Sequence, residues 1–214
     1  ARARGHRGEM AGARGAQRVW KSAVELEGHL AQHGLNPALY GVGGAKSVEQ
    51  LREEIAKGET LLRTEGGRLE RVVEVLSVMV RGRGGTFLLE DRQVLPTGES
   101  RSRRGVFLSE KLVPGEDWRA AVPRAVTEEL GSLRAADSDE FEIRVDEATY
   151  RKTVAEKVSN SYPGLLSKYH MHTVQAELTL ASAPLPAESF DTWEPRPGGR
   201  LRTFWRWGPA DSAD

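Results

Sequence analysis

The residues most able to do chemistry lie between Glu110 and Gly131, where acidic side chains recur at helical spacing. Residues three and four apart share one face of a helix, so Glu128 and Glu129 lie on the face that also carries position 125. Three carboxylates there would form a cradle for Mg²⁺, which polarises phosphoryl oxygens and acidifies a bound water. Position 125 is alanine, so two of those acids remain. The same glutamates can instead form a solvated edge, because an apolar stripe from Val122 onward gives this helix a packing role.

The order of residues in this stretch resembles the Nudix box, in which a glycine is followed six residues later by Glu and then by an Arg-Glu-aliphatic-x-Glu-Glu-x-Gly run. The positions that match in register are Glu116, Arg124, Val126, Glu128, Glu129 and Gly131. The resemblance covers about residues 68 to 207, and LSEKLVPGEDW and SYPGLLSKYHMH are similar to a poorly characterised plant and algal group. It implies that Glu128 and Glu129 hold the metal, that Glu116 braces it, and that Arg124 pairs with an acid of the box.

Three departures from the family pattern bear on activity. Glu110 stands where the box begins with glycine, Ala125 replaces a metal-binding acid, and Pro123 falls inside the expected helix. A proline there removes a backbone donor and crowds the preceding turn, which costs about 3 kcal/mol or kinks the helix. The degenerate box therefore implies a catalytically impaired Nudix-fold protein that acts as a structural or adapter subunit of a larger assembly. Protein partners are expected.

Two other functions stay open. One is a Mg²⁺-dependent pyrophosphohydrolase of a nucleoside diphosphate linked to another moiety, with Glu128 and Glu129 on the metal and Glu116 and Arg124 assisting. The other is a sensor that binds a nucleotide without cutting it. Mg²⁺ is expected as a cofactor only if the protein is active, and otherwise none is expected.

Local patterns predict the elements that would position the box. Apolar spacing predicts a helix over residues 19–33, and Ser47 with Gln50 forms a capping box that begins a second helix. A third helix is expected over 117–130, among segments rich in β-branched residues. The fold class is therefore α+β: a Nudix-like mixed β-sheet sandwiched by helices and preceded by a short helical N-terminal extension.

The same patterns divide the chain into four parts. Strands are expected at 68–81, 86–90, 101–108, 141–146, 169–180 and 201–207. The predicted parts are a basic Arg, Gly and Ala tail (1–18), the helical extension (19–62), the Nudix-like domain (63–208) and a C-terminal tail (209–214).

Composition excludes several classes of protein. The chain of 214 residues balances 31 basic against 31 acidic side chains, so a globally basic nucleic-acid binder is not expected, and nucleic acid would bind only through the basic tail. Without cysteine, disulfides and thiolate chemistry are excluded. The longest strongly apolar run, Val72 to Val80, is too short for a membrane span.

The basic tail carries five arginines against the single acid Glu9. Arg-rich, acid-poor leaders are typical of organellar targeting sequences, which favours chloroplast or mitochondrion over cytoplasm. An arm that docks on an acidic surface and a solvated tail are the alternatives.

Two further clusters are secondary candidates. His170 and His172 alternate along an expected strand and share one side, where they would bind metal or phosphate or simply form a half-exposed face. Arg101, Arg103 and Arg104 form a basic cluster near the expected pocket mouth. They would engage phosphates or acidic partners, or protect an edge strand by charge.

Overall fold

The computed structural model describes residues 18–135, 139–181 and 183–212. The predictions made for residues 1–17 of the basic tail, and for the last two residues, lie outside this range. The α-helices of the described residues are α1 (Ala23–Gln32), α2 (Val48–Ala56) and α3 (Trp118–Leu130). Short 3₁₀ turns occur at Pro37–Leu39, Arg83–Gly85, Gly131–Leu133 and Ala210–Ser212.

The strands of the described residues form two sheets. They are β1 (Leu61–Glu65), β2 (Arg68–Val80), β3 (Phe87–Val94), β4 (Ser100–Ser102), β5 (Leu108–Lys111), β6 (Phe141–Val158), β7 (Leu166–Leu180), β8 (Phe190–Arg196) and β9 (Gly199–Gly208). Sheet A has the order β1-β2-β7-β6, and β5 also pairs with β2. Sheet B has the order β4-β3-β9-β8. The β2–β7 pair is parallel, whereas the other strand pairs are antiparallel.

The α+β class is confirmed, but the strands divide between two sheets where one mixed sheet was expected. The sequence segment 101–108, predicted as one strand, explains part of the difference. It is split into β4 on sheet B and the start of β5 on sheet A, with a turn between them that contains Gly105 at φ 83°. The segment thus carries the chain from one sheet to the other.

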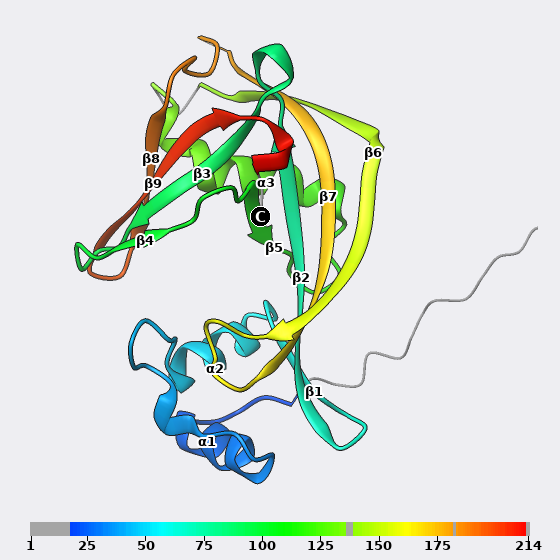
Figure 1. Ribbon diagram of the computed structural model, residues 1–214, viewed down its shortest axis with the longest axis vertical. Coiled ribbons are helices and arrows are strands. Elements are labelled where there is room, and N and C mark those ends of the chain that lie inside the picture. Colours follow the sequence, from blue (N-terminus) through cyan, green and yellow to red (C-terminus); the bar gives the residue numbers. More distant parts are fainter. Residues whose placement is uncertain (1–17, 136–138, 182, 213–214) are drawn as a thin grey trace, which may run out of the picture.

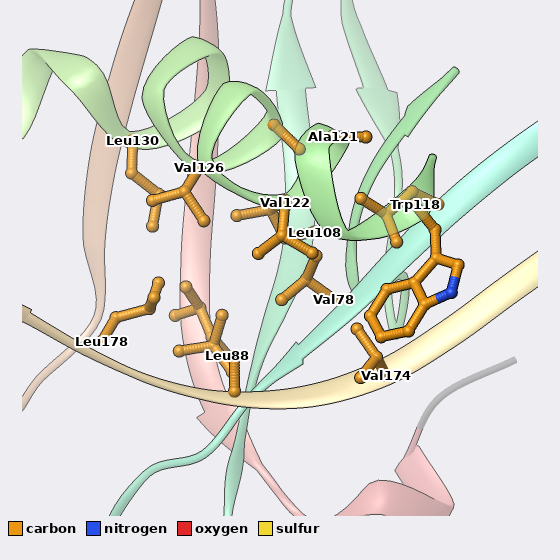
Figure 2. Close-up of a cluster of buried hydrophobic side chains, with 14 of the residues drawn as sticks. Val78, Leu88, Leu108, Trp118, Ala121, Val122, Val126, Leu130, Val174 and Leu178 are labelled. Carbon is orange, nitrogen blue, oxygen red and sulfur yellow. The ribbon is translucent and has the colours of Figure 1, made fainter. Parts of the chain in front are cut away.

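The main core lies where α3 packs against both sheets. Its side chains come from β2 and β7 of sheet A, from β3 and β9 of sheet B, and from one face of the helix. Figure 2 shows Trp118, Val122, Val126 and Leu130 of α3 directed at this core. Burial of these apolar side chains fixes the rotation of α3, and so it determines which residues of the box face outward.

The N-terminal helices build a second core at the other end of sheet A (Figure 1). Leu26 and Leu30 of α1 and Leu51 of α2 pack with Tyr162 and Leu165, which precede β7. The predicted capping box is confirmed, since Ser47 accepts from Gln50 N at 3.1 Å and Gln50 Oε1 accepts from Ser47 N at 2.8 Å. The first helix begins at Ala23, later than predicted, because the Ser22 side chain caps it by accepting from Glu25 N.

Pro123 was expected to cost stability or to kink the third helix. α3 continues through Pro123 to Leu130 as one helix.

In the part of the chain that the structure describes, no helix combines the length and apolar character that a bilayer crossing requires.

Candidate functional site

A tight turn places Glu116 just ahead of α3. Glu116 N donates to Val113 O at 3.0 Å, with Pro114 and Gly115 at the centre of the turn. Gly115 has a φ of 81°, a conformation that glycine adopts without the steric cost that a side chain would bring. Asp117 then caps the helix by accepting from Arg119 N at 2.9 Å. The local sequence therefore fixes where the carboxylate of Glu116 lies relative to the helix.

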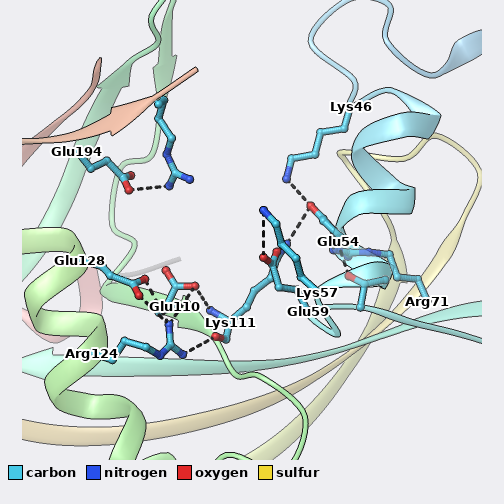
Figure 3. A network of polar contacts seen from close by, with 12 residues as sticks. Lys46, Glu54, Lys57, Glu59, Arg71, Glu110, Lys111, Arg124, Glu128 and Glu194 are labelled. Atoms are coloured by element: carbon cyan, nitrogen blue, oxygen red, sulfur yellow. Dashed lines mark hydrogen bonds and ion pairs between the residues drawn. The ribbon is translucent and has the colours of Figure 1, made fainter. Parts of the chain in front are cut away.

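Arg124 connects this loop to the helix. Its Nε and Nη2 donate to the two carboxylate oxygens of Glu116 at 2.9 and 2.8 Å, and its Nη1 lies 3.2 Å from Glu128 Oε1. Nη2 also donates to the backbone carbonyl of Lys111 at 2.9 Å (Figure 3). The hydrogen bonds from Arg124 lower the pKa of Glu116. Two of the predicted site acids are thus held by one guanidinium, a bidentate arrangement that favours rigidity.

Glu129 lies apart from this ion-pair group. It lines the cavity described below and makes no ion pair within 4.0 Å in the described ranges. Burial, followed by the charges of Glu90, Glu194 and Glu110, raises its pKa to about 8. Arg103 opposes this shift, but it is engaged by the buried Glu90, to which its Nε donates at 3.0 Å. At neutral pH the carboxyl of Glu129 is therefore mostly protonated.

Replacing Glu129 by glutamine is expected to change how stability depends on pH. A pKa raised from 4.5 to about 8 means that the free energy of unfolding falls as pH rises from 4.5 to 8. Glutamine removes this loss. The free energy of unfolding of the variant should therefore exceed that of the parent by on the order of 2 kcal/mol at pH 9 and should equal it at pH 4. Urea unfolding at both pH values measures the difference. A gain that is equal at pH 4 and pH 9 would contradict the raised pKa.

Position 125 does not join Glu128 and Glu129 at the cavity. Ala125 is 0% exposed and belongs to the main core, beside Ala121 and Val122. The expected face with three carboxylate positions is therefore wrong, because the packing stripe of α3 includes position 125. Glu110, which stands where the box begins with glycine, lies in β5 with ordinary backbone angles, since positive φ in the described residues is confined to glycine.

A cavity of about 1130 Å³ opens in front of the box. Its cationic walls include Lys46, Lys57, Arg101, Arg103, Lys111 and Arg196. Its acids include Glu59, Glu110, Glu116, Glu128, Glu129 and Glu194. These residues come from the α2 region, from β5 and α3, and from sheet B, so the cavity lies where three parts of the fold meet. The cavity thus combines lysines and arginines, which can bind phosphate groups, with glutamates, which repel them.

Sequence reasoning had missed the residues that β8 and the segment before α2 bring to this cavity. Glu194, Arg196 and the exposed Trp193 come from β8. Lys46 precedes α2 and bonds Glu54 of that helix. The sequence contained no local signal for these positions, because their proximity depends on the packing of distant segments.

The four predicted site residues Glu116, Arg124, Glu128 and Glu129 all line the cavity. Arg124 pairs with Glu116 and Glu128, in keeping with the implied pairing of this arginine with an acid of the box. Within residues 18–135, 139–181 and 183–212, no three His, Asp or Glu side chains are grouped as a metal would require. The expectation that Glu128 and Glu129 hold Mg²⁺ stays a prediction.

The secondary candidates are also separated by the structure. Arg101 and Arg103 line the cavity, whereas Arg104 lies outside it, 3.6 Å from Asp91. His172 bonds Glu74 at 3.2 Å and Tyr150 at 3.0 Å, and these residues are not part of the cavity wall. The two histidines do share one side of β7 as predicted, since His170 Nδ1 lies 3.9 Å from the same Glu74.

Comparison with known proteins gives similarity to solved structures but not to family models or curated proteins. No protein-family model matches the chain. No curated protein matches it either. Among solved structures, the chain is similar to a NUDIX hydrolase from Nitrosomonas europaea, with a TM-score of 0.30 and 11% sequence identity over 72% of this chain and 75% of that one. This is a weak similarity of structure.

Proposed function

We propose that the cavity binds the phosphate groups of a nucleoside diphosphate linked to another moiety, and that hydrolysis of such a ligand is impaired or absent. The protein then acts as a structural or adapter subunit of a larger assembly, on a Nudix-like fold. Binding is supported by the size of the cavity, about 1130 Å³, and by the lysines and arginines of its walls. A ligand of several phosphate and sugar groups matches a space of this size.

The observation that carries the impairment is the engagement of the box acids. Arg124 holds both Glu116 and Glu128, and the third position of the expected cradle is the buried Ala125. Hydrolysis of a diphosphate needs negative oxygens to be neutralised and a water to be activated. With the acid at position 125 missing and Glu128 paired with Arg124, Glu129 is the one box acid on α3 without an ion pair among the described residues, and this supports weak metal binding. The arrangement instead stabilises one wall of a binding cavity.

ADP-ribose is a suitable probe for both parts of this proposal. We expect isothermal titration to detect its binding to the full chain. We also expect turnover with Mg²⁺ to be no faster than that of a Glu128→Gln, Glu129→Gln double variant, which serves as the matched control. Turnover by the parent well above the double variant would contradict the impairment and favour the hydrolase. Failure to bind ADP-ribose would contradict the binding role.

The subunit role is supported by the exposed edge of sheet A. Among the described strands, β6 pairs with β7 alone, and all of residues 151–158 are exposed. Val154 and Val158 are 55% and 57% exposed. An unpaired strand edge can form backbone hydrogen bonds with a strand of another protein. In size-exclusion chromatography of an extract of its native source, we expect the protein to elute in a complex much larger than 23.6 kDa. Elution as a monomer would contradict the subunit role.

A further inference from the structure

The cationic side chains of the cavity differ in whether a carboxylate lies close enough to neutralise their charge. Arg103 donates to Glu90 at 3.0 Å, Arg196 lies 2.7 Å from Glu194, and Lys111 lies 3.1 Å from Glu59. Arg101 is different. In the part of the chain that the structure describes, no carboxylate lies within 4.0 Å of its guanidinium, although Arg101 lines the same cavity and is exposed to it.

A neutral amide holds Arg101 in place. Its Nε and Nη2 both donate to Gln93 Oε1, at 2.9 and 2.6 Å, across the β3–β4 pair in which these two residues are directly opposite. Gln93 is itself buried, and its Nε2 donates to Thr203 Oγ1 on β9 at 3.2 Å. The guanidinium is therefore oriented by a chain of hydrogen bonds that contains no negative charge. An acid in place of Gln93 would orient it equally well but would cancel its charge.

The surroundings of Arg101 contain charges of both signs, none of which is a direct carboxylate partner within the described residues. Burial is the main cause that lowers the pKa of Arg101, and the charges of Arg103 and Arg196 add to it, whereas those of Glu90 and Glu194 oppose it. Arginine stays protonated under these conditions. Within the described residues, the hydrogen bonds of Arg101 use Nε and Nη2 and leave Nη1 for a partner.

We propose that Arg101 is the anion-binding residue of a subsite on the sheet B side of the cavity, where it takes a phosphate group of the ligand. The inference rests on the proposed function, because it assigns one contact of the phosphorylated ligand. A phosphate fits this place better than a neutral group, since it supplies the negative charge and the acceptor oxygens that the guanidinium lacks. Gln93 also lines the cavity, but it is the positioning residue, since its amide is engaged by the guanidinium of Arg101 and by Thr203.

The test measures the binding of inorganic pyrophosphate to the full chain by isothermal titration at constant ionic strength. Arg101→Gln removes the charge, and Gln93→Glu keeps the arginine but gives it a carboxylate partner of nearly the same shape. Each change is expected to weaken pyrophosphate binding by about tenfold or more. Arg104→Gln is the matched control, since it removes a neighbouring arginine that is outside the cavity, and it should alter binding by less than about twofold.

The outcomes separate this inference from the proposed function. If the parent binds pyrophosphate and both variants bind it equally well, the role of Arg101 is wrong while the cavity remains a phosphate site. If the parent does not bind pyrophosphate at all, both proposals fail. Thermal unfolding of each variant checks its fold. Arg101 is exposed and its loss leaves the cores intact, so Arg101→Gln keeps the test decisive even if Gln93→Glu does not fold.

Discussion

Replacing Ala125 by glutamate is expected to lower the free energy of unfolding by about 4 kcal/mol and not to create a metal site. Ala125 is 0% exposed and packs in the main core, where a carboxylate finds no partner. The new side chain must be accommodated by neutralising its charge or by shifting α3 away from the sheets, and both are costly. Urea unfolding monitored by tryptophan fluorescence measures the loss, because Trp118 and Trp205 lie in this core.

Thr127→Glu is the matched control for this change. Thr127 is exposed on the same helix and lines the cavity, so a glutamate there should cost less than about 1 kcal/mol. An Ala125→Glu variant that is as stable as the parent and binds Mg²⁺ would show that position 125 reaches the cavity. The three-carboxylate cradle expected from the sequence would then stand, and the proposed impairment would have to be attributed to the missing acid alone.

The behaviour of position 125 shows what helical spacing can and cannot predict. Spacing places residues 125, 128 and 129 on neighbouring parts of one helix surface, but it does not say which part faces the core. The apolar residues Trp118, Ala121 and Val122 stand seven, four and three positions before 125. That pattern extends the buried stripe to Ala125, and it was the signal that could have placed this residue correctly.

Local signals were sufficient for the start of α2 and for the long strand β2, but not for the length of β6, which was expected only over 141–146. The Ser47–Gln50 box and the run of β-branched residues in 68–81 each depend on neighbours in sequence, and the structure has α2 and β2 there. The pairing of strands is another matter. β2 pairs in parallel with β7, which begins at Leu166, and no short-range pattern specifies such a partner. The division into two sheets therefore could not be predicted from these segments alone.

The same limit applies to the candidate site. Three acids and one arginine within residues 116–129 were predicted to lie together, and they line one cavity. Arg101 and Arg103 were expected near the pocket mouth, but the walls that β8 and the segment before α2 supply were not predicted, because tertiary packing brings these segments there. The family resemblance implied that Arg124 pairs with an acid of the box, and the structure has it bonded to both Glu116 and Glu128. The partner Glu128 lies one helical turn away, a spacing at which side chains meet.

Replacing Glu54 by glutamine is expected to lower the free energy of unfolding at pH 7 by about 3 kcal/mol. Glu54 is 6% exposed and bonds Lys46 of the segment before α2, Lys111 of β5 and Arg71 of β2 (Figure 3). Arg71 is 4% exposed, so glutamine leaves a buried guanidinium without its carboxylate. One buried acid thus ties the N-terminal helices to the strands that carry the cavity, and thermal or urea unfolding measures its contribution.

The direction in which this loss of stability changes with pH identifies the charge of Glu54 as its cause. Burial raises the pKa of this carboxyl, but the charges and hydrogen bonds of Lys111 and Lys46 outweigh burial and hold the pKa well below the ordinary 4.5. A depressed pKa stabilises the fold above 4.5, and the stabilisation declines as pH falls below that value. The difference in the free energy of unfolding between the parent and Glu54→Gln should therefore be largest at pH 7 and decrease steadily below pH 4.5. Glu53→Gln, an exposed neighbour on α2, should show almost no gap. A gap that stays constant down to pH 3 would mean that lost packing, and not the ion pairs, explains the effect.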